Sequence, residues 1–89
     1  MRIDGAIVRE QGLVFAIVIV KQQVTASSSE AASSRAAFQS QIRDFAGLPL
    51  ILASQDSNGV FEYQGRRDIV DFLASIDASR IPWKRYTIS

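Results

Sequence analysis

The sequence predicts an α/β fold, an α+β type of mixed sheet packed with helices as a two-layer sandwich in the order β-β-α-β-β-α-β. Three observations support this prediction. An unbroken apolar run over residues 13–20 is typical of a buried central strand. The pair Asn58-Gly59 between two apolar runs favours a tight hairpin. Apolar residues recur at helical spacing over residues 69–76.

The N-terminal segment is predicted to form a hairpin. Ala6-Ile7-Val8 and the run 13–20 flank the polar stretch 9–12, where Gly12 can adopt the positive φ that closes a short turn. Consecutive apolar residues cannot alternate between core and solvent, so both faces of segment 13–20 should be shielded. We expect this segment to be the central strand.

A helix is predicted to begin in the serine-rich stretch. Residues 27–30 read Ser-Ser-Ser-Glu, a capping box in which a hydroxyl accepts from a backbone N–H and the glutamate reaches back. Gly47 can supply a left-handed C-terminal cap just before Pro49. The apolar stripe of this helix is Ala31, Phe38, Ile42 and Phe45.

The C-terminal half is predicted to hold a second hairpin, a helix and a short edge strand. Strands 50–53 and 60–63 should pair as antiparallel neighbours across the turn 55–59. A final strand over 86–88 follows the break at Ile81-Pro82. The helix between them buries Ile69, Phe72, Leu73 and Ile76, while Asp68 and Asp71 suit its dipole as surface acids.

The handedness of connections suggests how these elements are arranged. Suppose that segments 13–20 and 50–53 are parallel neighbours joined by a right-handed crossover, and that the second helix returns the chain with the same hand so that 86–88 lies beside the first strand. Both helices would then lie on one face of the sheet. One face of the central strand would then be uncovered. A second copy, the C-terminal aromatic residues or a partner could shield it, and we therefore expect a tendency to form a homodimer.

Composition narrows the possible chemistry. The 89 residues predict a single small domain over 1–89, and the net charge of +1 does not favour general binding to nucleic acid or anionic lipid. The chain contains no cysteine and no histidine. These absences remove disulfide chemistry, a histidine-based serine triad and the commonest metal ligands, so we expect no cofactor and lean against an enzyme.

The location is predicted to be cytoplasmic. The apolar run 13–20 is far shorter than the roughly 20 residues that a membrane span needs. Together with Val24-Thr25-Ala26 it loosely resembles a secretory signal, but Asp4 and Glu10 place acidic residues in the region that should be basic. We therefore expect neither membrane insertion nor secretion.

The stretch 48–76, about a third of the chain, resembles the C-terminal half of a thioredoxin-like domain. The resemblance is carried by Pro49-Leu50-Ile51-Leu52, the turn ending in Gly59, the strand Val60-Phe61-Glu62-Tyr63, Gly65 and the helix through Phe72-Leu73. In that family the residue corresponding to Pro49 is a cis-proline beside the active site. The resemblance implies a shared half-fold and a shared ligand position.

The upstream region departs from that family in its chemistry. Ser27, Ser28 and Ser29 stand where the family's redox cysteine pair would be expected, and one intervening βα unit is missing before Pro49. Disulfide exchange is therefore excluded. The resemblance does not imply redox function.

A small-anion site is one hypothesis from the sequence. Hydroxyls of Ser27, Ser28 and Ser29 together with free N–H groups at a helix start can hold a phosphate or carboxylate, with Arg66 and Arg67 as further partners. The simpler interpretation is that the serines cap the helix and the arginines pair locally on the surface.

The C-terminal segment is a second candidate surface, for a protein partner or for nucleic-acid bases. The alternative is that the tryptophan folds back over the sheet with the charges pointing outward. The residues are Arg80, Trp83, Lys84, Arg85 and Tyr86.

The sequence thus favours a small binding or regulatory module that acts through a protein interface and is not redox-active. The alternatives are an anion-binding protein or enzyme that uses Ser27 to Ser29, and nucleic-acid binding through the C-terminal segment.

Overall fold

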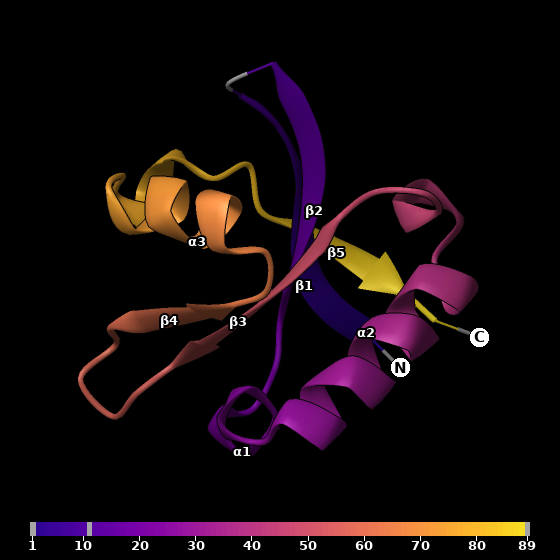
Figure 1. Cartoon of the computed structure of the whole chain (residues 1–89), viewed down its shortest axis with the longest axis horizontal. Coiled ribbons are helices and arrows are strands. Elements are labelled where there is room, and N and C mark those ends of the chain that lie inside the picture. Colours follow the sequence, from indigo (N-terminus) through magenta and orange to yellow (C-terminus); the bar gives the residue numbers. More distant parts are fainter. Residues whose placement is uncertain (1, 11, 89) are drawn as a thin grey trace.

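The structure is a computed structural model that describes residues 2–10 and 12–88. It confirms the predicted mixed α/β class (Figure 1). The elements are β1 (Arg2–Glu10), β2 (Leu13–Ile19), α1 (Gln22–Ala26), α2 (Ser28–Gln41), β3 (Leu50–Gln55), β4 (Phe61–Gln64), α3 (Arg67–Ala74) and β5 (Lys84–Thr87), with short 3-10 turns η1 (Arg43–Phe45) and η2 (Ala78–Arg80).

One five-stranded sheet runs through the chain in the order β4-β3-β2-β1-β5. β2 pairs with β3 in parallel, with Ala16 opposite Leu50, and every other pair is antiparallel. β2 therefore lies at the centre, as its unbroken apolar run predicts. The two predicted hairpins, β1–β2 and β3–β4, are confirmed. The sequence left the strand order open, and in the structure β5 lies beside β1.

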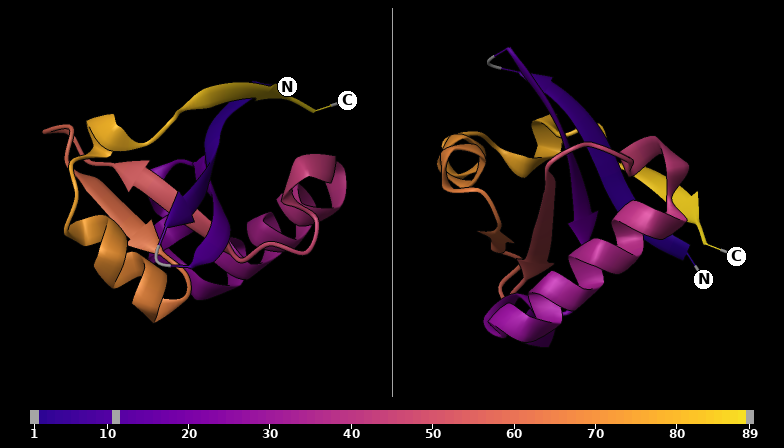
Figure 2. Two further views of the ribbon diagram at one scale, coloured as in Figure 1. Left: turned by 90° about the horizontal axis from the view of Figure 1, so that it is seen from above. Right: turned by 45° about the vertical axis from the view of Figure 1, so that its right-hand side comes forward.

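The two long helices cover opposite faces of this sheet, so the predicted two-layer arrangement is wrong. Alternate residues of β2 point into two separate clusters, Ala16 and Val18 beneath α2, Phe15 and Ile17 beneath α3. Figure 2 shows the strands lying between α2 and α3. The right-handed rule governs parallel strands, but β4 and β5 run antiparallel, so it does not fix the side on which α3 packs.

The core accordingly has two halves. The cluster beneath α2 is Ile3, Ala16, Val18, Ala31, Ile42, Phe45, Leu50, Leu52 and Ile88. The cluster beneath α3 is Ala6, Val8, Phe15, Ile17, Ile51, Ala53, Ile69, Leu73 and Ile81. Because β2 is covered on both faces, the uncovered sheet face that led us to expect a dimer is not present.

The predicted Ser27 cap is confirmed, since its side chain accepts from the Glu30 N–H, but the Ser27 N–H donates to the Val24 carbonyl and not to the Glu30 side chain. The surroundings of the helix differ from the prediction at both ends. Ser27 is the N-cap of α2, preceded by the unexpected short helix α1. The predicted apolar stripe extends past the end of α2, because Ile42 is the C-cap of this helix and Phe45 lies in η1. Gly47, with φ +76°, therefore follows η1 rather than α2.

Both hairpin turns use glycines at positive φ, which was predicted for Gly12. Gly12 has φ +70° and Gly59 has φ +80°. The remaining turn residue of the first hairpin, Gln11, lies outside the described residues. Among the described residues, no helix has the length and apolar character needed to cross a membrane.

Candidate functional site

Of the three serines in the predicted anion site, Ser27 is the N-cap of α2. The Ser27 Oγ accepts a hydrogen bond from the Glu30 N–H at 3.3 Å and lies 3.2 Å from the Ser29 Oγ. Ser28 and Ser29 are exposed in the first turn of α2. The hydroxyl best placed to face a ligand is thus already used by the backbone.

The arginines of that hypothesis lie at the start of α3. Arg66 binds Asp68 through two hydrogen bonds, Nε to Oδ1 at 2.8 Å and Nη2 to Oδ2 at 2.9 Å. The hydrogen bond from Arg66 holds the pKa of the Asp68 carboxyl below its ordinary value of 3.8. Arg67 is exposed. Since α2 and α3 cover opposite faces, the sheet separates these arginines from Ser27 to Ser29.

Trp83 folds back onto the sheet rather than standing free. Its ring stacks on Phe61 with centroids 5.7 Å apart and 19° between planes, and its Nε1 donates to the Ala78 carbonyl at 3.1 Å. It packs against the cluster beneath α3. This is the structural alternative that the sequence left open.

Tyr86 lies on the other side of the sheet from Trp83. Its ring meets Phe45 edge-on at 4.9 Å, and the Lys84 Nζ lies 5.3 Å from the same ring. Arg85 pairs with Asp4 at 3.4 Å, while Arg80 is exposed in η2. The two C-terminal aromatic rings therefore do not share one stacking surface.

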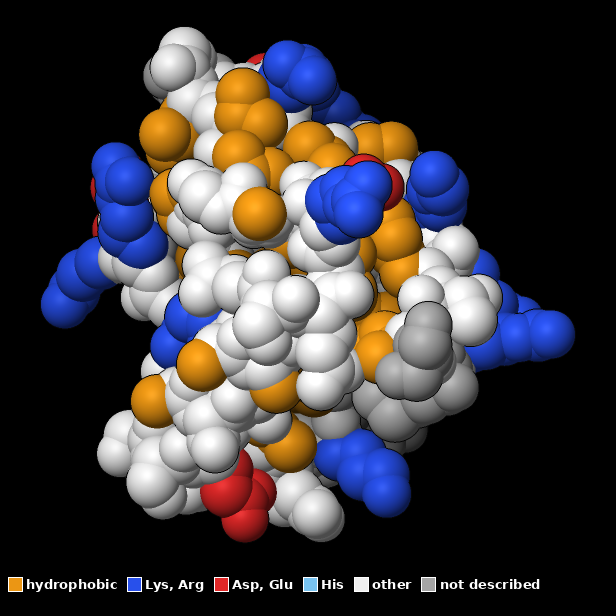
Figure 3. Space-filling view, turned by 90° about the vertical axis from the view of Figure 1, so that its right-hand side faces the viewer, with side chains coloured by type: hydrophobic (Ala, Val, Ile, Leu, Met, Phe, Trp, Pro, Cys, Tyr) orange, Lys and Arg blue, Asp and Glu red, His pale blue; other side chains and the backbone are white. Residues whose placement is uncertain are grey.

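Basic side chains are also dispersed elsewhere. On the face that carries α2, Lys and Arg lie in several separate groups, divided by hydrophobic and uncharged side chains (Figure 3). Nucleic-acid backbones are usually bound by basic residues clustered on one face. No such cluster is visible on this face.

β4 leaves one edge of its backbone open. Val20 donates its N–H to the Ala53 carbonyl, so the N–H and C=O of Ala53 point toward β2 and not toward β4. Ala53 and Tyr63, which lie opposite each other, therefore form one of the antiparallel pairs that exchange no backbone hydrogen bonds. The N–H and C=O of Tyr63 consequently point away from β3, to the open side of β4. The same alternation turns the N–H and C=O of Phe61 outward.

The surface beside this edge is apolar. Phe61 and Tyr63 stack with centroids 6.0 Å apart, and the neighbouring Val60 is 58% exposed. A shallow cavity of ≈ 320 Å³ adjoins them, and its lining is Gly59, Val60, Phe61, Tyr63, Leu73, Ala74, Ile76 and Ala78. At the opposite edge of the sheet, β5 carries Lys84 and Arg85, charges that discourage strand pairing.

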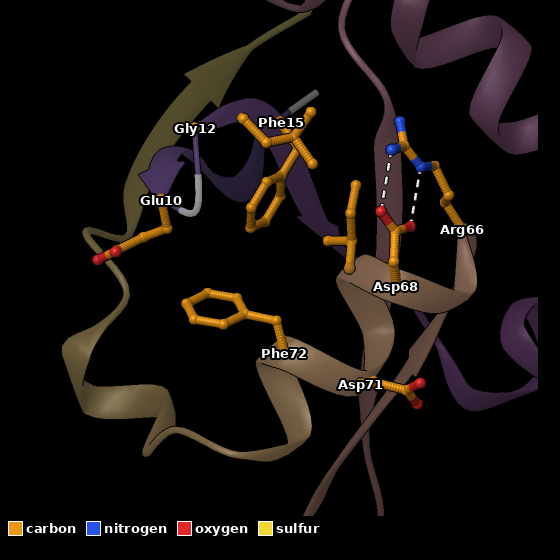
Figure 4. A pocket seen from close by; sticks show the side chains of 9 residues that line it. Glu10, Gly12, Phe15, Arg66, Asp68, Asp71 and Phe72 are labelled. Atoms are coloured by element: carbon orange, nitrogen blue, oxygen red, sulfur yellow. Dashed lines mark hydrogen bonds and ion pairs between the residues drawn. The ribbon is translucent and has the colours of Figure 1, made fainter.

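A larger cavity of ≈ 590 Å³ lies between the β1–β2 hairpin and α3 (Figure 4). It combines apolar side chains with charged ones. The lining residues are Glu10, Gly12, Leu13, Phe15, Arg66, Asp68, Ile69, Asp71 and Phe72. The sequence did not indicate this cavity, because the cavity depends on α3 lying on the same face of the sheet as Phe15.

The described residues contain no cluster of three or more carboxylate, histidine or cysteine side chains that could hold a metal ion. The chain matches no protein-family model, no curated protein and no solved structure.

Proposed function

We propose that this protein is a small binding module that acts through a protein interface, by adding an extended strand of a partner protein to β4. The observation that carries the proposal is the outward-facing backbone of Phe61 and Tyr63 beside the shallow cavity of ≈ 320 Å³. Strand addition draws affinity from main-chain hydrogen bonds and specificity from alternate side chains.

The side chains of β4 define the partner strand. Phe61 and Tyr63 face the α3 side, so partner residues on that side should be apolar. Glu62 points to the other face, is exposed and makes no ion pair within the described residues. A basic partner residue opposite Glu62 would supply the missing charge, so we expect alternating apolar and basic residues.

A backbone test separates strand addition from ordinary side-chain contact. Heptapeptides displayed on phage are selected against the protein and then measured on two variants, Tyr63→Ala and Tyr63→Pro. Both remove the ring, but only proline removes the outward N–H, a change that edge strands tolerate. Selected peptides should bind Tyr63→Pro about two- to tenfold more weakly than Tyr63→Ala, because a main-chain hydrogen bond is lost.

Equal binding to the two variants, or peptides without alternating apolar residues, would contradict the proposal. Glu62→Lys is the charge control, and it should reverse the preference for basic peptides. Sedimentation tests the homodimer as the other occupant. A dimer that Tyr63→Pro removes would assign this edge to a second copy and overturn the partner strand.

Two further properties belong to this proposal. A thioredoxin-like half-fold over 48–76 is supported by the β3–β4 hairpin leading into α3, although the Leu48–Pro49 peptide bond is trans, unlike the family's cis-proline. A cytoplasmic location is supported by the cysteine-free composition, which suits a reducing compartment.

A further inference from the structure

The cavity between the β1–β2 hairpin and α3 has an apolar floor built from two separate elements. Phe15 of β2 and Ile69 of α3 are buried, with 1% and 2% exposed, and Leu13 and Phe72 are half-buried beside them. The rings of Phe15 and Phe72 meet edge-on with centroids 6.5 Å apart. Figure 4 shows these two rings between Glu10 on one side and the Arg66–Asp68 pair on the other.

The charged residues around this floor are unbalanced. Three carboxylates against one guanidinium leave a formal charge of −2 on the lining, although the whole chain is at +1. Arg66 is bound to Asp68 by both of its hydrogen bonds. Within the described residues, Glu10 and Asp71 make no ion pair.

We propose that this cavity binds a small amphiphilic cation, a compact aromatic or branched apolar group that carries one ammonium. The apolar group would lie against the half-buried Leu13 and Phe72, above the buried Phe15 and Ile69, and the ammonium would lie toward the unpaired carboxylates. The volume of ≈ 590 Å³ lies within the range of small-molecule sites. The negative lining disfavours anions, and the open part of the half-buried Phe72 ring favours cations.

Three probes with the same ring separate charge from shape. 2-Phenylethylammonium is the cation, 2-phenylethanol the neutral analogue and 3-phenylpropanoate the anion. Each is titrated into the full chain at low salt and followed by amide and methyl NMR shifts. The cation should bind most tightly, shift signals of Leu13, Ile69 and Phe72, and weaken as salt is raised.

Matched variants then identify the carboxylates. Glu10→Gln and Asp71→Asn should each weaken the cation by about two- to fivefold and leave the neutral probe unchanged, because both side chains are exposed. Glu62→Gln on β4 removes the same charge away from the cavity and should have no effect. Cation and neutral probe binding equally, shifts centred elsewhere, or equal losses in all three variants would overturn the proposal.

Discussion

The Nε of Arg35 donates a hydrogen bond of 2.9 Å to the carbonyl oxygen of Leu50. The same guanidinium donates through Nη2 to the Gln64 carbonyl at 3.2 Å and to the Gln64 side-chain Oε1. One half-buried side chain of α2 is thereby tied to both β3 and β4. Partial burial lowers the pKa of Arg35, but a guanidinium remains charged at any ordinary pH.

Replacing Arg35 should loosen this attachment. Arg35→Met keeps much of the aliphatic stem but leaves the Leu50 carbonyl without its charged donor, and we expect the free energy of unfolding to fall by about 1–2 kcal/mol. Urea unfolding followed by circular dichroism measures the change. Arg43→Met, at an exposed site, is the control and should stay within about 0.5 kcal/mol of the parent protein. Equal losses in both variants would show that the hydrogen bonds contribute nothing.

Gly5 is required by close packing rather than by backbone flexibility. A Cβ at this position would lie 2.7 Å from the backbone oxygen of Ile17 and 3.4 Å from the rings of Phe45 and Tyr86. Because this nearest atom is a backbone oxygen of the neighbouring strand β2, it cannot rotate away as a side-chain atom could. Gly5→Ala should lower the free energy of unfolding by about 1–3 kcal/mol in urea titrations. A variant as stable as the parent would mean that β1 and β2 can separate freely here.

Trp83 contributes through its ring and through its N–H. Trp83→Phe keeps an aromatic ring near Phe61 but removes the hydrogen bond to Ala78, which should cost about 0.5–1.5 kcal/mol. Trp83→Ala should cost about 1–2 kcal/mol more, because it also removes the stacked apolar area. Thermal unfolding by circular dichroism ranks the two. The order would be reversed or absent if the ring were not packed in solution.

We expect both tyrosines to lose their protons at a higher pH than an ordinary tyrosine. Burial raises the pKa of Tyr63 and of Tyr86 above the ordinary 10.0, with smaller contributions from Asp77 and Asp44 respectively. The folded state therefore holds these protons more tightly than the unfolded chain. The corresponding stability is fully present below pH 10.0 and is lost as pH rises through the folded-state pKa values.

Near-ultraviolet absorbance of the phenolate, followed against pH, tests the raised pKa values of the two tyrosines. The midpoint should lie above 10.0 in the folded protein and return to about 10 in strong denaturant. The double variant Tyr63→Phe with Tyr86→Phe should lose less stability between neutral and alkaline pH than the parent protein. A folded-state midpoint at the ordinary value would contradict the burial of both rings.

Much of the fold follows from local sequence signals. The Asn58-Gly59 turn, the Ser27 cap and the apolar run through β2 each specify an element through contacts between near neighbours. The side of the sheet taken by α3 was wrongly predicted, because it depends on the direction of β5 relative to β4. That direction is set by pairing between distant segments, which periodicity does not encode.

The predicted site residues were harder to place for the same reason. Trp83 just before β5 and Tyr86 within it are near neighbours in sequence, yet their rings pack on opposite faces of the sheet. Arg66 is charged, but its contact with Asp68 satisfies it locally. The open edge of β4 could be inferred once the strand order was known, whereas the cavity beside Phe72 required α3 to be placed first.

The pairing of β1 with β5 has a consequence for how the chain folds. The two hairpins join residues close in sequence, whereas Arg2 pairs with Thr87. Closing so long a loop is entropically costly before its contacts are made, so we expect β5 to dock late. Substitutions in β5 should then accelerate unfolding far more than they slow refolding, and those in the β3–β4 hairpin should do the reverse.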